Sequence, residues 1–416
     1  MLDIRFIREN PELVAEKSKQ KGYDVNIDKL LQIDENRRKL TGEIERVRAE
    51  RNQLADKQKN GKPDAASIEQ GKKLKDSLGQ LEDQLGPVSS EYEKLLRAIP
   101  NVTPDDTPLG GEEDSVEVKK WGDIAQKDFE PLDHLTWAEQ RGLLDFERGA
   151  KVAGNKFYFL KGPLVELELA VCQLGMELAK KHGFLPMLVP HLVNTRTLEG
   201  AGFSARGDEK QIYKVEDEDL NLIATAEIPL TGYHADEILS AADLPVKFAG
   251  LSPAYRVEGG AYGKHNRGLF RTHQFNKLEL YIFCKPSESE EWHQKMVALE
   301  EEFCQLLEIP YHVVRIAAGD LGAPAYKKFD IEYWSPVDKT YRELMSCSNV
   351  TDYQARRLNI RYKNKDGQTE FLHTLNGTLA AMSRIPIALI ENFQDKEGKV
   401  SIPKALQIYM QGQTNL

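Results

Sequence analysis

The chain has 416 residues, of which 40% are hydrophobic, and its 66 acidic and 56 basic residues give a formal net charge of −10. This length allows two or three domains with a large buried core. The acidic balance excludes a protein that wraps nucleic acid over its whole surface, so any RNA contact must use a local basic patch. No apolar run approaches the roughly 20 residues that cross a bilayer, and the N-terminus lacks the features of a secretory signal.

The four cysteines are widely spaced and include no C-x-x-C pair. This spacing argues against a disulfide scaffold and against a zinc site. We therefore expect a cytoplasmic protein that has no zinc and does not associate with membranes.

The first hundred residues predict two long helices that pack against each other. Apolar residues recur in steps of three and four over residues 30–54 and again over 74–99, which is coiled-coil spacing. A polar segment at 60–64 joins the two stretches, so we predict an antiparallel helical hairpin over about residues 30–98. Gly86-Pro87 lies inside the second arm and predicts a kink or a restart of the helix.

A segment rich in proline, glycine and acidic side chains, 106–118, is typical of a linker between an N-terminal domain (1–105) and a C-terminal domain (119–416). The C-terminal part lacks the regular βαβ rhythm of a doubly wound sheet. We predict an α+β fold with an antiparallel β-sheet flanked by helices. The expected strands are 246–254, 268–284, 311–315, 329–334 and 370–375, and the expected helices lie near 163–182, 287–307 and 378–393.

The segment 268–284 carries the chemistry. Because side chains alternate along a strand, Arg271, Phe275 and Glu279 are expected on one face, opposite an apolar face suited to a core. A cation, an aromatic ring and a carboxylate suit a phosphate, a base and an ammonium group. Arg256 and Glu258 share a face just upstream, before a glycine-rich basic loop that can approach phosphates. The alternative is an ordinary hairpin with a solvated, charged face.

These residues resemble a known family. Tyr255 to Glu258 and the segment from Arg271 to Glu279 resemble motif 2 of class II aminoacyl-tRNA synthetases, and the H-Q-F-x-K-x-E ending is the form found in the seryl-tRNA synthetase family. The resemblance extends to the opening MLDIRFIRENPELV, the helical hairpin and the segments 157–160, 225–227, 343–349, 354–357 and 373–376. It implies a class II catalytic domain that activates L-serine with ATP and Mg²⁺ and loads it onto tRNA(Ser), and also onto tRNA(Sec) where that exists.

The resemblance implies roles for individual residues. Arg256, Glu343 and Arg384 are the expected catalytic residues, with Arg256 on the α-phosphate and Arg384 on the γ-phosphate. The full set expected to bind ATP is Arg256, Val257, Glu258, Arg271, Phe275, Glu343, Leu344, Met345, Ser346 and Arg384. The set expected to bind serine is Thr225, Ala226, Glu227, Arg256, Glu279 and Thr378.

Glu343 and Ser346 are the implied ligands of Mg²⁺. Because they are three residues apart, an extended strand would point them in opposite directions, so a bend is required. Met345 replaces the serine that is more usual in the family, although a backbone contact survives such a change. Arg384 is expected two turns into a helix, which Pro386 should bend near Met382.

Other expectations concern partners. Arg37, Arg38, Arg46, Arg48, Lys72 and Lys75 on the hairpin are candidates for tRNA binding, although a solvated coiled-coil exterior would look similar. By the resemblance, the helix from Leu164 to Gly183 corresponds to motif 1 and forms a homodimer.

Three other functions compete with that of a complete synthetase. One is a ligase of the same fold that loads a carrier protein, and another is a non-catalytic RNA-binding paralogue. The third is a synthetase for threonine or proline.

Overall fold

The computed structural model describes residues 1–58, 64–203, 212–258 and 267–416. The chain divides into two compact units, Met1–Val102 and Thr103–Leu416. Much of the predicted hairpin turn at 60–64, and most of the glycine-rich loop after Glu258, lie outside the described residues. Among the described residues, no helix is both long enough and apolar enough to cross a bilayer.

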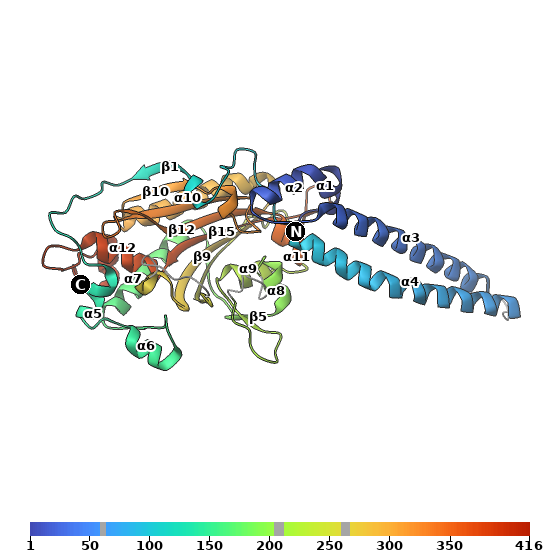
Figure 1. Ribbon diagram of the computed structural model, residues 1–416, viewed down its shortest axis with the longest axis horizontal. Helices are drawn as coiled ribbons and strands as arrows, with labels where there is room; N and C mark the ends of the chain where they lie inside the picture. Colours follow the sequence, from blue (N-terminus) through green and yellow to red (C-terminus); the bar gives the residue numbers. More distant parts are fainter. Residues whose placement is uncertain (59–63, 204–211, 259–266) are drawn as a thin grey trace. The chain divides into compact units, whose positions relative to one another are not determined.

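The described residues of the first unit form four helices: α1 (Ile4–Glu9), α2 (Pro11–Gln20), α3 (Ile27–Gln58) and α4 (Ala65–Ala98). Figure 1 shows α3 and α4 side by side as a long pair, and at 1.5 Å per residue each is roughly 50 Å long. The predicted apolar seam is present, because Ile44, Val47 and Leu78 are buried between the two helices. The predicted hairpin is confirmed by this packing.

The expected restart at Pro87 was wrong, because α4 is continuous across it. A proline removes one backbone hydrogen bond, and apolar contacts on either side compensate for that loss. Leu85 packs on the seam, and Tyr92, two turns further along, lies in a small core with Leu30 and Leu96. Packing therefore stabilises α3 from Ile27 to Val47 and α4 from Leu78 to Leu96, where the buried side chains lie.

The second unit is built around an eight-stranded sheet whose neighbours are antiparallel, except for the parallel pair β4 and β8. The strands lie in the order β1 (Val116–Trp121), β10 (Tyr311–Arg315), β11 (Lys327–Ser335), β12 (Thr340–Thr351), β15 (His373–Ala381), β9 (Gln274–Cys284), β8 (Val246–Tyr255) and β4 (Leu185–Leu188). The predicted antiparallel sheet flanked by helices is confirmed.

In the described part of the second unit, three smaller sheets accompany the main one. They pair β14 (Thr369–Phe371), β13 (Arg361–Lys363) and β7 (Ile238–Ser240); β2 (Leu144–Asp145) and β3 (Phe159–Leu160); and β5 (Leu192–Val193) and β6 (Asn221–Leu222). The remaining helices are α5 (His134–Gln140), α6 (Phe146–Ala153), α7 (Pro163–Lys181), α8 (Thr195–Gly200), α9 (Glu227–Gly232), α10 (Ser289–Leu306), α11 (Tyr353–Leu358), α12 (Arg384–Phe393) and α13 (Lys404–Gln407).

The main core covers one face of this sheet. Leu278, Leu280, Ile282 and Cys284 of β9 point into it, as strand alternation predicts, and meet side chains from α7, α10 and α12. All four cysteines are free and buried, and Cys347 packs into the same core. The opposite face of β9, β12 and β15 therefore carries the polar side chains that form the candidate site.

Candidate active site

Glu279 lies at the centre of the polar face. It is 2% exposed and stands directly opposite Thr378 in the pairing of β9 with β15. Its carboxylate lies 2.6 Å from the Lys277 Nζ and accepts a 3.3 Å hydrogen bond from the Thr378 hydroxyl. Thr378 was expected in the first turn of a helix, but it belongs to β15, because that strand continues to Ala381. The pairing places a carboxylate and a hydroxyl side by side, which suits a small polar ligand with an ammonium group.

A second carboxylate, Glu227, lies next to this pair. The triplet Thr225-Ala226-Glu227 follows the apolar pair Leu222-Ile223, which predicts a strand or its end, but Glu227 is the first residue of α9. The Thr225 hydroxyl accepts a hydrogen bond from the Glu227 backbone N–H. The Glu227 Oε1 accepts hydrogen bonds from Gln354 (2.8 Å) and Asn376 (3.0 Å). Desolvation, together with the charge of Glu279, raises the pKa of Glu227 to about 7. Glu227 is thus a buried acid poised to ionise when a cation binds.

The motif 2 residues form two contact pairs. The Arg256 guanidinium lies 5.2 Å from the centre of the Phe275 ring, and Arg271 donates a 3.1 Å hydrogen bond to Glu258. The expectation that Arg271 shares a strand with Phe275 and Glu279 was wrong, because β9 begins only at Gln274. Residues Gly268–Phe270 instead form the 3₁₀ turn η3. Phe275 and Glu279 are thus presented by the strand, whereas Arg271 is presented by the turn before it.

A β-bulge in β12 places Glu343 and Ser346 on the same face of the strand. Ser346 pairs with Asp330 of β11 and Glu343 pairs with Glu332, so Leu344 is an extra residue in β12. Because Asp330 and Glu332 are two residues apart on one strand, they share a face, and their partners share it too. The required bend is therefore present. Leu344 and Met345 are each 1% exposed, so only their backbones can reach a ligand.

Arg384 is the first residue of α12, not a residue two turns into a helix as expected. It lies 2.9 Å from the Glu343 carboxylate and donates a 3.0 Å hydrogen bond to the Glu343 carbonyl. Pro386 does not bend a helix near Met382, because it falls in the first turn of α12, where the missing N–H has no intrahelical partner to lose.

The cations and carboxylates lie close enough to shift one another's pKa. Desolvation opposes ionisation of Glu343, but the charges of Arg384, Lys328 and Arg256 lower its pKa to about 2. Burial and the nearby Arg384 lower the pKa of Arg256. Arg256 and Arg384 thus converge with Glu343 in one region, where a bound polyanion would relieve the repulsion between the two arginines.

The donor set fits Mg²⁺ bound together with phosphates. In the part of the chain that the structure describes, no cluster of three or more His, Cys, Asp or Glu side chains could hold a metal alone. Glu343 and Ser346 offer a carboxylate and a hydroxyl on one face, and magnesium commonly binds through one or two carboxylates with substrate phosphates completing its shell.

Comparison with known proteins accounts for both units. Residues 1–103 match the model of the seryl-tRNA synthetase N-terminal domain, and residues 213–393 match that of the class II tRNA synthetase core domain (G, H, P, S and T). The serine–tRNA ligase of Dictyoglomus turgidum is 46% identical, over 99% of this chain and 98% of that protein. That of Rubrobacter xylanophilus is 44% identical over 99% and 98%.

The chain belongs to the seryl-tRNA synthetase family.

Solved structures of that family agree with the fold. Seryl-tRNA synthetase from Pyrococcus horikoshii, crystallised with ATP, superposes with a TM-score of 0.91 at 39% identity, covering 100% of this chain and 99% of that one. The cytoplasmic serine–tRNA ligase of Naegleria fowleri, in complex with AMP, gives a TM-score of 0.86 at 32% identity, with 100% and 98% covered. A seryl-tRNA synthetase fold therefore spans the whole chain.

The family resemblance included the segments 354–357 and 373–376 but gave no role to two of their polar residues, Gln354 and Asn376. Gln354 links four segments, because it donates to Glu227 and to the Ala201 carbonyl and accepts from Tyr281 and Thr374. Asn376 lies two residues before Thr378 on the same strand face and donates to Glu227. Gln354 and Asn376 are amide side chains within segments that are otherwise apolar or β-rich. An amide in such a segment indicates a buried side chain that forms hydrogen bonds.

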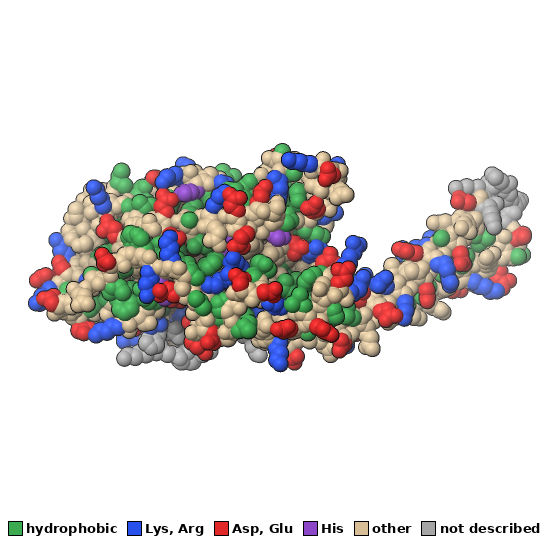
Figure 2. Space-filling model, turned by 90° about the horizontal axis from the view of Figure 1, so that it is seen from above, with side chains coloured by type: hydrophobic (Ala, Val, Ile, Leu, Met, Phe, Trp, Pro, Cys, Tyr) green, Lys and Arg blue, Asp and Glu red, His purple; other side chains and the backbone are tan. Residues whose placement is uncertain are grey.

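The helical pair carries balanced charge. Figure 2 shows basic and acidic side chains interleaved along it. Arg37 pairs with Asp34, Arg46 with Glu50, and Arg48 with Glu82, whereas Arg38, Lys72 and Lys75 have exposed side chains. Arg37 lies where the three-and-four spacing of residues 30–54 calls for an apolar side chain, and its guanidinium lies 4.2 Å from the centre of the Tyr92 ring.

Proposed function

We propose that the site forms seryl-adenylate from L-serine and ATP and then transfers the seryl group to tRNA(Ser), or to tRNA(Sec) where that exists. The observation that carries this proposal is the convergence of two arginines on Glu343, beside the buried acids Glu227 and Glu279. The first region suits a triphosphate and the second suits an amino acid.

ATP would lie along the face that carries Arg256, Phe275 and Arg384. Arg256 takes the α-phosphate, Arg384 the γ-phosphate, and the Phe275 ring stacks on adenine, whose amino group Glu258 recognises. The half-buried Val257 and the buried Leu344 and Met345 contribute through their backbones. Arg271 lies beside the nucleotide, from the turn before β9.

Serine would lie between Glu227, Glu279 and Thr378. Its ammonium group is held by the two carboxylates and by the backbone of Thr225 and Ala226. Its hydroxyl is recognised by Glu279 and Thr378, which already share a hydrogen bond. A site built to pair with a hydroxyl leaves buried polar groups without partners when alanine binds, so it rejects alanine strongly.

The chemistry needs no protein nucleophile. A serine carboxylate oxygen attacks the α-phosphorus, the bond from that phosphorus to the bridging oxygen breaks, and pyrophosphate leaves with the electron pair. Arg256 offsets charge at the α-phosphate, and Arg384 offsets charge on the leaving group. Glu343 and Ser346 would hold Mg²⁺, which when bound neutralises phosphate charge. The seryl group then passes to a hydroxyl of the terminal adenosine of the tRNA, releasing AMP.

The N-terminal domain (1–105) would bind tRNA through α3 and α4, while residues 119–416 form the catalytic domain after the linker 106–118. Arg37, Arg38, Arg46, Arg48, Lys72 and Lys75 are the proposed contacts. Arg37, Arg46 and Arg48 pair with acidic side chains in the unbound protein. When RNA binds, each would contact a phosphate in place of its acidic partner. Recognition of RNA shape rather than sequence suits such a contact.

The proposed homodimer would form through the motif 1 region on α7. Apolar side chains are exposed there and on the neighbouring strand: Leu169 is 64% exposed, Leu185 59% and Leu188 81%. Clustered exposed apolar side chains mark association surfaces. We place the enzyme in the cytoplasm.

Serine-dependent exchange of pyrophosphate into ATP, followed by charging of tRNA(Ser), tests the proposal. We expect both reactions with serine and neither with threonine, proline or alanine. Exchange without tRNA charging would indicate a ligase for another carrier. Absence of exchange together with RNA binding would indicate a non-catalytic paralogue.

A further inference from the structure

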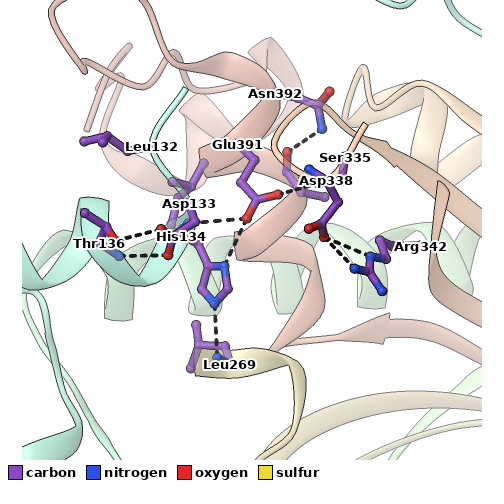
Figure 3. Close-up of polar contacts among 12 residues, drawn as sticks. Leu132, Asp133, His134, Thr136, Leu269, Ser335, Asp338, Arg342, Glu391 and Asn392 are labelled. Atoms are coloured by element: carbon purple, nitrogen blue, oxygen red, sulfur yellow. Dashed lines mark hydrogen bonds and ion pairs between the residues drawn. The ribbon is translucent and has the colours of Figure 1, made fainter. Parts of the chain in front are cut away.

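A buried polar pair, His134 and Glu391, joins three segments that are far apart in the sequence (Figure 3). His134 begins α5, and its Nδ1 lies 3.0 Å from the Oε1 of Glu391, near the end of α12. On the other side of the ring, the Leu269 backbone N–H, in η3, donates a 3.1 Å hydrogen bond to the His134 Nε2. The two side chains are only 3% and 2% exposed.

The backbone N–H of Leu269 determines which ring nitrogen of His134 carries the proton. A backbone N–H can only donate, so the His134 Nε2 must accept and the proton must lie on Nδ1, which donates to Glu391. Glu391 also accepts from the Ser335 hydroxyl (3.0 Å) and from the His134 backbone N–H (3.3 Å). The chain of hydrogen bonds therefore has one direction, from η3 through the imidazole to the carboxylate.

The turn fits closely against this ring. Gly268 has a φ of +61°, and a Cβ at that position would lie 2.4 Å from the His134 Nε2. Phe270 packs edge-on against the imidazole, with the ring centres 5.5 Å apart. All three residues of η3 are thus shaped or held by His134, and η3 directly precedes Arg271.

Glu391 also connects the pair to α12, which begins with Arg384, and to Ser335 at the end of β11. Glu391 is on the helix that begins with Arg384, about 10 Å along its axis at 1.5 Å per residue. Ser335 ends β11, its Oγ accepts from the Asp338 backbone N–H, and Asp338 pairs with Arg342. The guanidinium of Arg342 in turn lies 5.7 Å from the centre of the Phe270 ring. A closed set of contacts therefore surrounds η3.

We propose that His134 and Glu391 are positioning residues that lock η3, and with it Arg271 and the start of β9, against the helix that carries Arg384. The inference rests on the proposed function, because it assigns the pair to the binding of ATP. The pair acts through η3, which precedes Arg271, and through α12, which begins with Arg384. Serine is bound by Glu227, Glu279 and Thr378. Glu279 also belongs to β9, but it lies inside the sheet, paired with Gly250 of β8 and Thr378 of β15, so its position depends little on η3.

Two substitutions of the same residue separate positioning from mere packing. His134→Phe keeps a ring against Phe270 but leaves the Leu269 N–H and Glu391 without their partner. His134→Gln offers an amide oxygen to Leu269 and an amide N–H to Glu391. His182→Phe is the matched control, because His182 forms a surface histidine–glutamate pair with Glu302 at 2.7 Å.

The readout is the KM for ATP, compared with the KM for serine, in pyrophosphate exchange. We expect His134→Phe to raise the KM for ATP about tenfold, as for the loss of one buried hydrogen bond, with the KM for serine nearly unchanged. His134→Gln should recover most of the loss, and His182→Phe should match the wild type. An unchanged KM for ATP in His134→Phe, an equal rise for both substrates, or no rescue by glutamine overturns the inference.

A milder substitution, Ser335→Ala, tests the inference if His134→Phe does not fold. Should His134→Phe fail to fold, Ser335→Ala removes a single donor to Glu391 and is expected to raise the KM for ATP by a smaller factor, again with serine spared. No selective rise there also overturns the inference. Absence of exchange in the wild-type protein would instead refute the proposed function, so the two failures are distinguishable.

Discussion

Replacing Glu227 with glutamine should weaken serine binding yet stabilise the unliganded protein. Folding raises the pKa of Glu227 from its ordinary 4.5 to about 7, chiefly through desolvation. Above pH 7 the folded protein must therefore bury an ionised group that ionises easily in the unfolded chain. The difference corresponds to about 3 kcal/mol. Glutamine keeps an acceptor for Gln354 and Asn376 without a charge, so Glu227→Gln should increase the free energy of unfolding by up to that amount at pH 8.

The sign of the pH dependence is the sharpest part of this prediction. Because a raised acid pKa destabilises the fold only where the group is ionised, the advantage of Glu227→Gln should shrink as the pH falls from 7 towards 4.5. Thermal unfolding without serine, at pH 8 and at pH 5, measures it. At the same time the KM for serine should rise by about ten- to a hundredfold, as for the loss of a charge-assisted hydrogen bond.

Glu237→Gln is the control for the pH-dependent stability of Glu227→Gln. Glu237→Gln removes an exposed carboxylate that pairs with His234, and it should show no such pH-dependent gain. A Glu227→Gln variant that is less stable than the wild type at pH 8, or that binds serine normally, would refute the reasoning.

Three further predictions follow from the same site and from the helical pair. Arg256→Ala should lower the rate of pyrophosphate exchange by about 10²- to 10³-fold with the circular dichroism spectrum unchanged; near-normal exchange would exclude its phosphate role. Arg384→Gln should move the acid limb of the pH profile of kcat, measured at saturating serine, upward by about 1 pH unit. Arg384 is the charge that lowers the pKa of Glu343 most, and solvent screens part of its effect. Arg384→Lys keeps that charge and should leave the acid limb in place. Removing residues 40–88, which spares the core around Leu30 and Tyr92, should preserve exchange and abolish tRNA charging; loss of both reactions would mean that the pair also supports the catalytic unit.

Periodic features of the fold could be predicted from the sequence. The heptad spacing gave the helical pair, and the predicted helix 163–182 became α7 (Pro163–Lys181). The strand predicted at 311–315 has those bounds, and the one predicted at 246–254 extends to Tyr255. These elements bury a continuous apolar stripe or face, and that burial is what periodicity detects.

Element ends near the site were harder to predict. Thr378 and Arg384 were both expected in one helix, because the apolar run 379–390 contains no polar break except Ser383 and Arg384. In the structure the run is divided between β15 and α12, each buried on different partners. A short apolar run does not distinguish strand from helix, and only tertiary pairing with β9 decided it.

Contacts across the fold were the least accessible to sequence reasoning. Glu343 and Ser346 were paired by the family resemblance, but the bulge that makes the pairing possible depends on the register of β11. His134 and Glu391 are 257 residues apart, and neither lies in a recognisable motif. A side chain whose role is to support another segment leaves no local pattern.

The single additional residue at Leu344 is absorbed by the bulge, so the two halves of β12 pair with β11 as if Leu344 were absent. Deleting Leu344 would leave Glu343 opposite Glu332 and Ser346 opposite Asp330, and both side chains would keep their face. Deleting a residue from a regularly paired stretch of β12 would instead turn every side chain on one half of the strand to the other face. Anyone redesigning this site for another substrate should therefore place a change of chain length at the bulge and keep the spacing in the regularly paired stretches.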